Sequence, residues 1–272
     1  MSSCNDRNEK LTNALSKSVY NLIGTRKKIP ISFSGGIDSY ITAALAKKYS
    51  NPILYTIGNL TAKDILYSKI ASKSLGCPLE IINLTDGNIE NGIRNTIKLI
   101  GQKNSLDVLI ATSFYLIAER ISKDDFDVCL SGQGADELFF GYDKYRRALA
   151  DGNNPNDLRN KDLIELEDLF LNREYKIFEN FNLKLLSPFF DEEVKKIGIQ
   201  IEREHNLRDA NDDLRKHTLR EIARDLGAPP EIVARKKKAF QYGSGILQNI
   251  RKISKEKNLP SSLNAYLEYI KK

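Results

Sequence analysis

The fold is decided by Ile29-Pro30-Ile31-Ser32-Phe33-Ser34-Gly35-Gly36-Ile37-Asp38-Ser39, in which an apolar strand runs into a Ser-Gly-Gly turn. A helix is expected to begin directly after the turn. The adjacent glycines, Gly35 and Gly36, allow the backbone to turn sharply and to present bare N–H groups to an anion, and the helix directs its positive end to the same place. The hydroxyl groups of Ser34 and Ser39 add further donors. This stretch therefore predicts a phosphate-binding loop.

The negatively charged carboxylate of Asp38 would repel a phosphate group, so its expected role at an anion site is to hold a metal ion. Mg²⁺ that bridges the phosphates is the ion we expect. The loop lacks the Gly-Lys-Ser/Thr of a Walker A motif and the Gly-x-Gly-x-x-Gly of dinucleotide-binding folds. Two interpretations remain open at this point. The loop either binds a nucleotide–metal complex or is a strand-turn-helix junction whose glycines serve the turn alone.

Length and composition set the class of protein. With 272 residues and 41% hydrophobic content, the chain can form one large α/β domain or two small ones around a substantial core. The polar first ten residues do not resemble a signal peptide, and the longest apolar run, from Val108 to Ala118, is too short to cross a bilayer. We therefore expect a soluble, cytoplasmic protein without a membrane partner. The scattered Cys4, Cys77 and Cys129 suggest neither a disulfide framework nor a zinc site.

Hydrophobic periodicity alternates between helices and strands in the first half of the chain. Helices are predicted over residues 9–23, from 37 onward, and over 62–75 and 107–121, and strands before Ser34 and over 52–57, 79–84 and 126–130. This alternation predicts an α/β fold, a parallel sheet with helices on both faces and a ligand at the carboxyl ends of the strands. Gly58 follows a strand at that edge and could approach a nucleoside, although a turn is the commoner explanation. Beyond residue 150 we expect helices and no further strand.

A second elbow follows the strand over 126–130, with the sequence Ser131-Gly132-Gln133-Gly134-Ala135-Asp136-Glu137. It repeats the layout of strand, glycine turn and helix. Asp136 and Glu137 fall in the first turn of the expected helix, where acidic residues are also ordinary partners of a helix N-terminus. This stretch alone does not separate that structural role from a functional one.

Five motifs in one order make the chain resemble the synthetase domain of class B asparagine synthetases and its relatives, the β-lactam and carbapenam synthetases. These belong to the PP-loop ATP pyrophosphatase superfamily. The resemblance covers nearly the whole sequence, and five ordered motifs are far more specific than any one of them. The motifs are Ser34-Gly-Gly-Ile-Asp38-Ser39, Ser131-Gly-Gln-Gly-Ala-Asp136-Glu137 with Phe139-x-Gly141-Tyr142, Pro188-Phe-x-Asp191, Lys216-x-x-Leu219-Arg220, and Arg235-x-Lys237-x-x-Phe240-x-x-Gly243.

The resemblance implies a single domain over residues 1–272. A nucleotide-binding core of the adenine nucleotide α-hydrolase-like type is expected at about 25–150, followed by a mostly helical part at about 151–272. The implied cofactors are ATP and Mg²⁺, with the ion held by Asp38 and Asp136. Lys237 matches the family lysine that stabilises charge developing on phosphate during adenylation. The residues implied to bind the nucleotide are Ser34, Gly35, Gly36, Asp38, Ser39, Gly58, Ser131 and Gly132.

The resemblance also implies a reaction. Family members activate a substrate carboxylate as an acyl-adenylate, release pyrophosphate and let an amine attack; in asparagine synthetases the acid is aspartate and the amine is ammonia. A carboxylate oxygen is a poor leaving group and AMP is a good one, so adenylation converts an unreactive acid into an acyl donor. We therefore expect an ATP-dependent carbon–nitrogen ligase whose partners are a small, aspartate-like carboxylic acid and an amine.

Two features depart from the family pattern. Gln133 stands where asparagine synthetases usually carry glutamate, and a neutral amide cannot accept a proton or hold an ammonium-like group as a carboxylate can. As a catalytic candidate, Gln133 therefore indicates either altered substrate choice or lost activity.

No amino-terminal glutaminase domain is recognised, and Cys4 is not at the position of its nucleophile. Ammonia would then come from solution or from a separate glutaminase subunit.

Two other classes stay open. The formal charge of +6 and the shared loop also suit a PP-loop enzyme that adenylates a tRNA base. The sequence has neither a Cys-x-x-Cys pair nor an appended RNA-binding module, so a nucleic-acid partner is not expected. Gln133 also prompts the hypothesis of a nucleotide-binding paralogue without catalysis. Homo-oligomerisation is compatible with the sequence.

Overall fold

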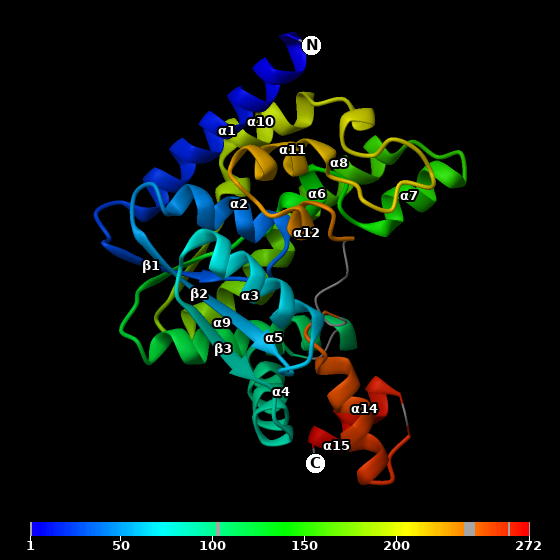
Figure 1. Cartoon of the computed structure of the whole chain (residues 1–272). Coiled ribbons are helices and arrows are strands. Elements are labelled where there is room, and N and C mark those ends of the chain that lie inside the picture. The colour runs from blue at the N-terminus through cyan, green and yellow to red at the C-terminus, as the bar shows by residue number, and fades with distance from the viewer. Residues whose placement is uncertain (1, 102–103, 237–242, 261, 272) are drawn as a thin grey trace.

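The structure is a computed structural model that describes residues 2–101, 104–236, 243–260 and 262–271 (Figure 1). Five strands form one parallel sheet in the order β3-β2-β1-β4-β5. Their bounds are β1 Lys28–Ser32, β2 Asn51–Gly58, β3 Leu79–Asn83, β4 Val128–Leu130 and β5 Lys184–Leu186. The α/β class predicted from the sequence is therefore confirmed. β1, which leads into the first elbow, lies at the centre of the sheet.

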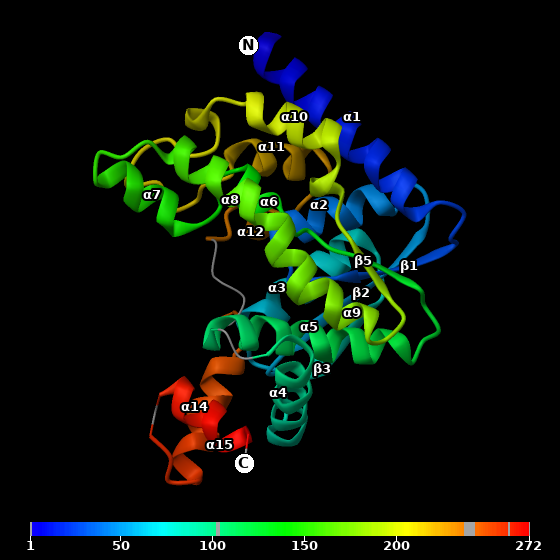
Figure 2. The ribbon, with the colours of Figure 1, turned by 180° about the vertical axis from the view of Figure 1, so that it is seen from behind.

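Helices cover both faces of the sheet, as the opposite views in Figures 1 and 2 show. Successive strand residues point to opposite faces. Leu130 therefore joins a core with α1, α2 and α11 (His217–Asp225), whereas Cys129 joins a core with α4, α5 and α9 (Lys176–Glu179). Both Cys77 and Cys129 are buried free thiols. The helices of the first half are α1 Ser2–Ile23, α2 Ile37–Ala46, α3 Lys63–Leu75, α4 Asp86–Ile100 and α5 Ser105–Ser122.

The second half is mostly helical, as predicted, but it also supplies the outermost strand. β5 pairs in parallel with β4, so the expectation that no strand follows residue 150 is wrong. The three residues Lys184, Leu185 and Leu186 are too few to show a strand period in the sequence. They adopt the extended form because β4 offers an unpaired edge, and Leu185 is fully buried there.

The remaining helices pack around the sheet and the first five helices (Figure 1). α14 and α15 pack on α4, and the termini lie at opposite ends of the molecule. None of the described helices is both long and apolar enough to span a bilayer. The bounds are α6 Ala135–Leu138, α7 Asp143–Ala150, α8 Pro155–Phe170, the π-helical turn η1 Leu171–Tyr175, α9 Lys176–Glu179, the 3-10 turns η2 Pro188–Phe190 and η3 Arg203–His205, α10 Glu192–Gln200, α11 His217–Asp225, α12 Pro230–Val233, α14 Ile246–Glu256 and α15 Leu263–Lys271.

Candidate active site

The first glycine elbow joins β1 to α2 and packs tightly against α3. Gly35 has a φ of +66°, in the left-handed region that favours glycine, and a Cβ there would lie 2.5 Å from the backbone nitrogen of Ser68. Within the turn, the N–H of Gly36 donates to the Ser34 hydroxyl at 3.3 Å, and the Ser39 hydroxyl donates to the Gly36 carbonyl at 3.1 Å. The two predicted hydroxyl groups therefore also shape the loop itself.

The second elbow lies directly against the first, because β4 pairs with β1 in parallel and both turns leave the same edge of the sheet. A Cβ on Gly132 would lie 2.9 Å from the Cβ of Asp38, so the absence of a side chain lets the two turns touch. The Ser187 hydroxyl donates to the Gln133 carbonyl at 2.6 Å and holds the second turn against the end of β5. Sheet topology thus brings together two motifs that lie far apart in the sequence.

The aspartates of the two elbows converge on one buried ammonium group. Lys216 Nζ lies 2.7 Å from Asp38 Oδ2 and 2.7 Å from Asp136 Oδ1, and the lysine side chain is 2% exposed. The two carboxylates therefore face a shared centre, as a common metal ion requires, although the cation that joins them here is a lysine. The sequence patterns by themselves predict no role for Lys216. Its place in the motif Lys216-x-x-Leu219-Arg220 is the signal that points to it.

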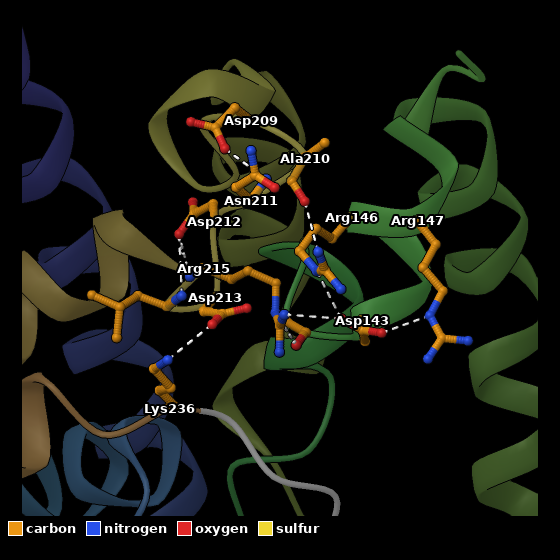
Figure 3. A network of polar contacts seen from close by, with 12 residues as sticks. Asp143, Arg146, Arg147, Asp209, Ala210, Asn211, Asp212, Asp213, Arg215 and Lys236 are labelled. Carbon is orange, nitrogen blue, oxygen red and sulfur yellow. Dashed lines mark hydrogen bonds and ion pairs between the residues drawn. The ribbon is translucent and has the colours of Figure 1, made fainter. Parts of the chain in front are cut away.

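Polar contacts join the loop before α11 to the start of α7 (Figure 3), and this loop leads directly into Lys216. Arg215 and Lys216 have φ values of 54° and 53°, a left-handed conformation that is uncommon for residues other than glycine. Asp212 Oδ1 accepts the N–H groups of Leu214 and Arg215, both at 3.1 Å. The Arg215 guanidinium donates to the Gly141 carbonyl at 3.0 Å. The turn is thus held from two sides, which presents the Lys216 side chain to the elbows.

Glu137 is a buried carboxyl group beside these aspartates. The Tyr142 hydroxyl donates to Glu137 Oε1 at 2.8 Å. Glu137 Oε2 is buried and accepts no hydrogen bond from the residues that the structure describes. Burial, followed by the negative charge of Asp136, raises the pKa of Glu137. This residue therefore belongs to the interior of the site and is not a solvated partner of a helix terminus.

Gly141 leaves no room for a side chain beside the lysine, since a Cβ there would lie 2.0 Å from Asp136 Oδ1 and 2.1 Å from Lys216 Cε. We expect Gly141→Ala to displace both groups and to lower the free energy of unfolding by about 1–3 kcal/mol through overpacking. Denaturant unfolding measures this loss. The matched control is Gly87→Ala in α4, where nothing lies within 4 Å of the added Cβ. If both variants unfolded at the same denaturant concentration as the wild type, the tight contact at Gly141 would be contradicted.

Both elbows open into one cleft of about 500 Å³. Seven of the residues predicted for the site line it together, which supports a common binding region. These residues are Ser34, Asp38, Ser39, Ser131, Gly132, Gln133 and Asp136.

One face of α8 also lines the cleft, and the sequence patterns do not predict this face as part of the site. Its lining residues recur at helical spacing and place carboxylates next to apolar groups: Asp162, Glu165, Leu166, Leu169 and Phe170. Lys144 of α7 also lines the cleft and pairs with Asp162 at 2.6 Å. Helical periodicity could have found this face, but it does not distinguish a face that packs on a core from one that lines a cleft.

Three predicted nucleotide-binding glycines, Gly35, Gly36 and Gly58, do not contribute to the lining of this cleft. A Cβ on Gly58 would lie 2.9 Å from the carbonyl oxygen of Ser244, and the N–H of Asn59 donates to the same oxygen at 3.1 Å. Gly58 therefore admits the backbone at residue 244 close to the end of β2. Contact of Gly58 with a nucleoside stays a prediction.

Lys237 lies outside the described residues, but the residues just before it are anchored at the first elbow. Arg235 Nη1 donates to the Ser34 carbonyl at 2.8 Å. Lys236 pairs with Asp213 at 2.9 Å, which ties this segment to the loop that carries Lys216 (Figure 3). Arg235 therefore lies at the edge of the predicted phosphate loop, and Lys236 lies beside the loop that carries Lys216.

The donor set at the elbows fits a hard divalent cation. Asp38 Oδ1 is buried and accepts no hydrogen bond from any described residue, so one oxygen of this carboxylate is available to a further partner. Mg²⁺ in nucleotide sites commonly takes a few carboxylate oxygens together with substrate phosphates and waters. Within the described ranges, no group of three or more His, Cys, Asp or Glu side chains could form a metal cage by itself. Asp38 and Asp136 therefore suit Mg²⁺ that shares its ligands with phosphate oxygens.

Among solved structures, NMN synthetase from Francisella tularensis aligns with 98% of this chain and 92% of its own, at 13% identity and a TM-score of 0.48. A TM-score this low does not establish a shared function.

Sequence relatives are more informative. A Methanocaldococcus jannaschii protein named as a glutamine-hydrolysing asparagine synthetase is 28% identical over 97% of this chain and 54% of its own length. Asparagine synthetase B of Escherichia coli is 26% identical over 88% of this chain and 45% of its own length. The chain thus spans about half the length of these relatives. The family model described as asparagine synthase matches residues 10–181 and 171–267. These matches cover most of the sequence, and the chain therefore belongs to the asparagine synthase family.

Proposed function

We propose that this chain is an ATP-dependent synthetase that adenylates a small carboxylic acid and transfers the acyl group to an amine. The observation that carries the proposal is the convergence of two glycine elbows in one cleft, with Asp38 and Asp136 each 2.7 Å from the same ammonium group. Membership of the asparagine synthase family supports an ATP-dependent ligase. The named relatives are about twice as long, so the complete reaction of this chain is part of the proposal.

The first elbow is the proposed site for the β and γ phosphates of ATP. Ser34, Ser39 and the N-terminus of the ten-residue helix α2 supply donors and a positive dipole end. Asp38 and Asp136 are the proposed ligands of Mg²⁺, which when bound neutralises phosphate charge and assists the departure of pyrophosphate. Lys216 adds a fixed positive charge at the same place.

The proposed reaction exchanges a poor leaving group for a good one. An oxygen of the substrate carboxylate attacks the α-phosphorus of ATP, the bond to the bridging oxygen breaks, and pyrophosphate leaves toward Lys216 and the donors of the first elbow. The amine then attacks the acyl carbon of the acyl-adenylate. AMP departs with the former carboxylate oxygen, and the amine nitrogen loses a proton to solvent. The two elbows hold the reacting groups in one cleft, which favours both steps by proximity.

Two residues have proposed roles that depend on the family resemblance. Lys237 stabilises charge on the α-phosphate during adenylation, and the anchoring of Arg235 on the Ser34 carbonyl supports its placement near the phosphate loop. Gln133 lines the cleft and, as a neutral amide, can hydrogen-bond the incoming amine but cannot take its proton. The proposed amine is ammonia or a small primary amine, and a separate glutaminase subunit is a proposed source of ammonia.

The experiment that tests this function measures pyrophosphate release from ATP and Mg²⁺ with individual small carboxylic acids, beginning with aspartate. We expect one acid to stimulate release above the level with ATP alone. When that acid carries ¹⁸O in its carboxylate and the amine is added, label in AMP shows that the carboxylate attacked the α-phosphorus, and the amide product shows that the acyl group was transferred to the amine. If ATP binds and no acid stimulates pyrophosphate release, the ligase proposal fails.

A further inference from the structure

Lys216 is the common partner of both aspartates that are proposed to hold the metal. Its Nζ lies 2.7 Å from Asp38 Oδ2 and from Asp136 Oδ1, so one ammonium group offsets half of the charge of the two carboxylates. Asp38 Oδ1 accepts no hydrogen bond from the described residues, so it is available to a metal ion. A divalent cation that enters here therefore lies close to a positive charge that is already present.

The ammonium group cannot move away at low cost. Lys216 is 2% exposed, and its Cε lies where a side chain on Gly141 would have to go. The backbone on its N-terminal side is held by Arg220, a buried guanidinium that donates to the carbonyl oxygens of Arg215, at 2.7 Å, and of Leu214. The same guanidinium donates to the carbonyl of Arg235 at 3.0 Å, which links this turn to the segment on the first elbow.

We propose that Lys216 makes binding of the divalent metal conditional on the nucleotide. Without phosphates, the ion and the fixed ammonium group compete for two carboxylates, and their mutual repulsion in a partly desolvated site weakens binding. Polyphosphate brings several negative charges that attract both cations, so the metal enters as a complex with the nucleotide. Lys216 thereby disfavours occupation of the site by metal alone. This inference rests on the proposed metal site, but not on the identity of the acid or the amine.

The test compares Mn²⁺ binding by the full chain with and without a non-hydrolysable ATP analogue, using electron paramagnetic resonance to count free Mn²⁺. We expect Lys216→Met to bind Mn²⁺ alone about tenfold or more tightly than the wild type, because the competing charge is gone. With the analogue present, this advantage should shrink or reverse. Lys17→Met is the control, since Lys17 also pairs with a carboxylate, that of Glu193 at 2.9 Å, but does not line the cleft, and it should behave as the wild type.

Lys216→Gln repeats the comparison should the methionine variant fail to fold, and thermal unfolding of each variant establishes which one to use. If neither variant gains affinity for Mn²⁺ alone relative to the wild type, the inference is wrong. A gain equal to that of Lys17→Met would also overturn it, since the effect would then come from the loss of any positive charge on the protein. Pyrophosphate release by the wild type is measured separately, so a failed ligase reaction and a failed metal dependence are distinguishable.

Discussion

Asp38→Asn is expected to lower acid-stimulated pyrophosphate release by about 100- to 1,000-fold, the range seen when one electrostatic stabiliser of a transition state is removed. An amide is a weaker ligand for Mg²⁺ than a carboxylate, and it removes one of the two charges that Lys216 joins. Asp136 would then be the one charged carboxylate of the two elbows that pairs with Lys216. Initial rates of pyrophosphate release at saturating ATP measure the effect, and Asp136→Asn should give a loss of the same order.

Asp124→Asn is the matched control for this prediction. Asp124 is also an ion-paired carboxylate, 2.6 Å from Arg120, but it precedes β4 at the amino edge of the sheet, away from the elbows. It should keep pyrophosphate release within about twofold of the wild type, since an exposed ion pair contributes little to stability. The proposal of a shared metal site would not survive if a folded Asp38→Asn protein retained more than about a tenth of wild-type activity.

Gln133→Glu is expected to produce or raise ammonia-dependent amide formation by about 100-fold or more, within the range of general acid–base catalysis. The cleft-lining amide at this position can donate to or accept from an amine but cannot take a proton from it, whereas a carboxylate can do so and also attracts an ammonium-like group. The Ser187 hydroxyl contacts the backbone carbonyl of Gln133, so the turn should keep its shape in the variant. Amide formation with ammonium as the sole nitrogen source measures the change.

Gln133→Met separates this effect from a change of cleft shape, because methionine has a similar length and no strong acceptor. It should give no gain with ammonia. Pyrophosphate release provides the second readout, since both variants should still adenylate the acid. Equal rates of amide formation in the glutamate and methionine variants would show that residue 133 takes no part in the amine step. If amide formation with ammonia rises only in Gln133→Glu, the wild-type enzyme is specialised for an amine other than ammonia.

The sequence predicts the elbows and the sheet well because both depend on local signals. Glycine pairs after apolar strands specify turns at the carboxyl edge, and β1 and β4 then bring Asp38 and Asp136 together. Their convergence is required by the topology and needs no knowledge of side-chain packing. The strand pattern over 52–57 and 79–84 likewise matches β2 and β3 within about two residues, the usual precision of strand ends.

Other parts of the site depend on contacts that no local pattern contains. Lys216 reaches Asp38 across 178 positions of sequence, and it does so from a left-handed turn held by Asp212 and Arg220. A lysine in a charged stretch is ordinarily a surface residue. The α8 face and β5 were missed for related reasons, since a helical period does not name its partner and three residues are too short to show a strand. The role of Lys237 remains a prediction that rests on its motif alone.

The position of β5 has a consequence for how the chain can be divided. A fragment that ends near residue 150 would keep both glycine elbows and all the residues of the first four strands, yet it would lose the strand that pairs along β4. The backbone N–H and C=O groups of β4 would then form a bare sheet edge, which invites pairing with other molecules. The helical half therefore completes the sheet, because it supplies the strand that covers the edge of β4. Expression of the amino-terminal half alone should yield aggregates.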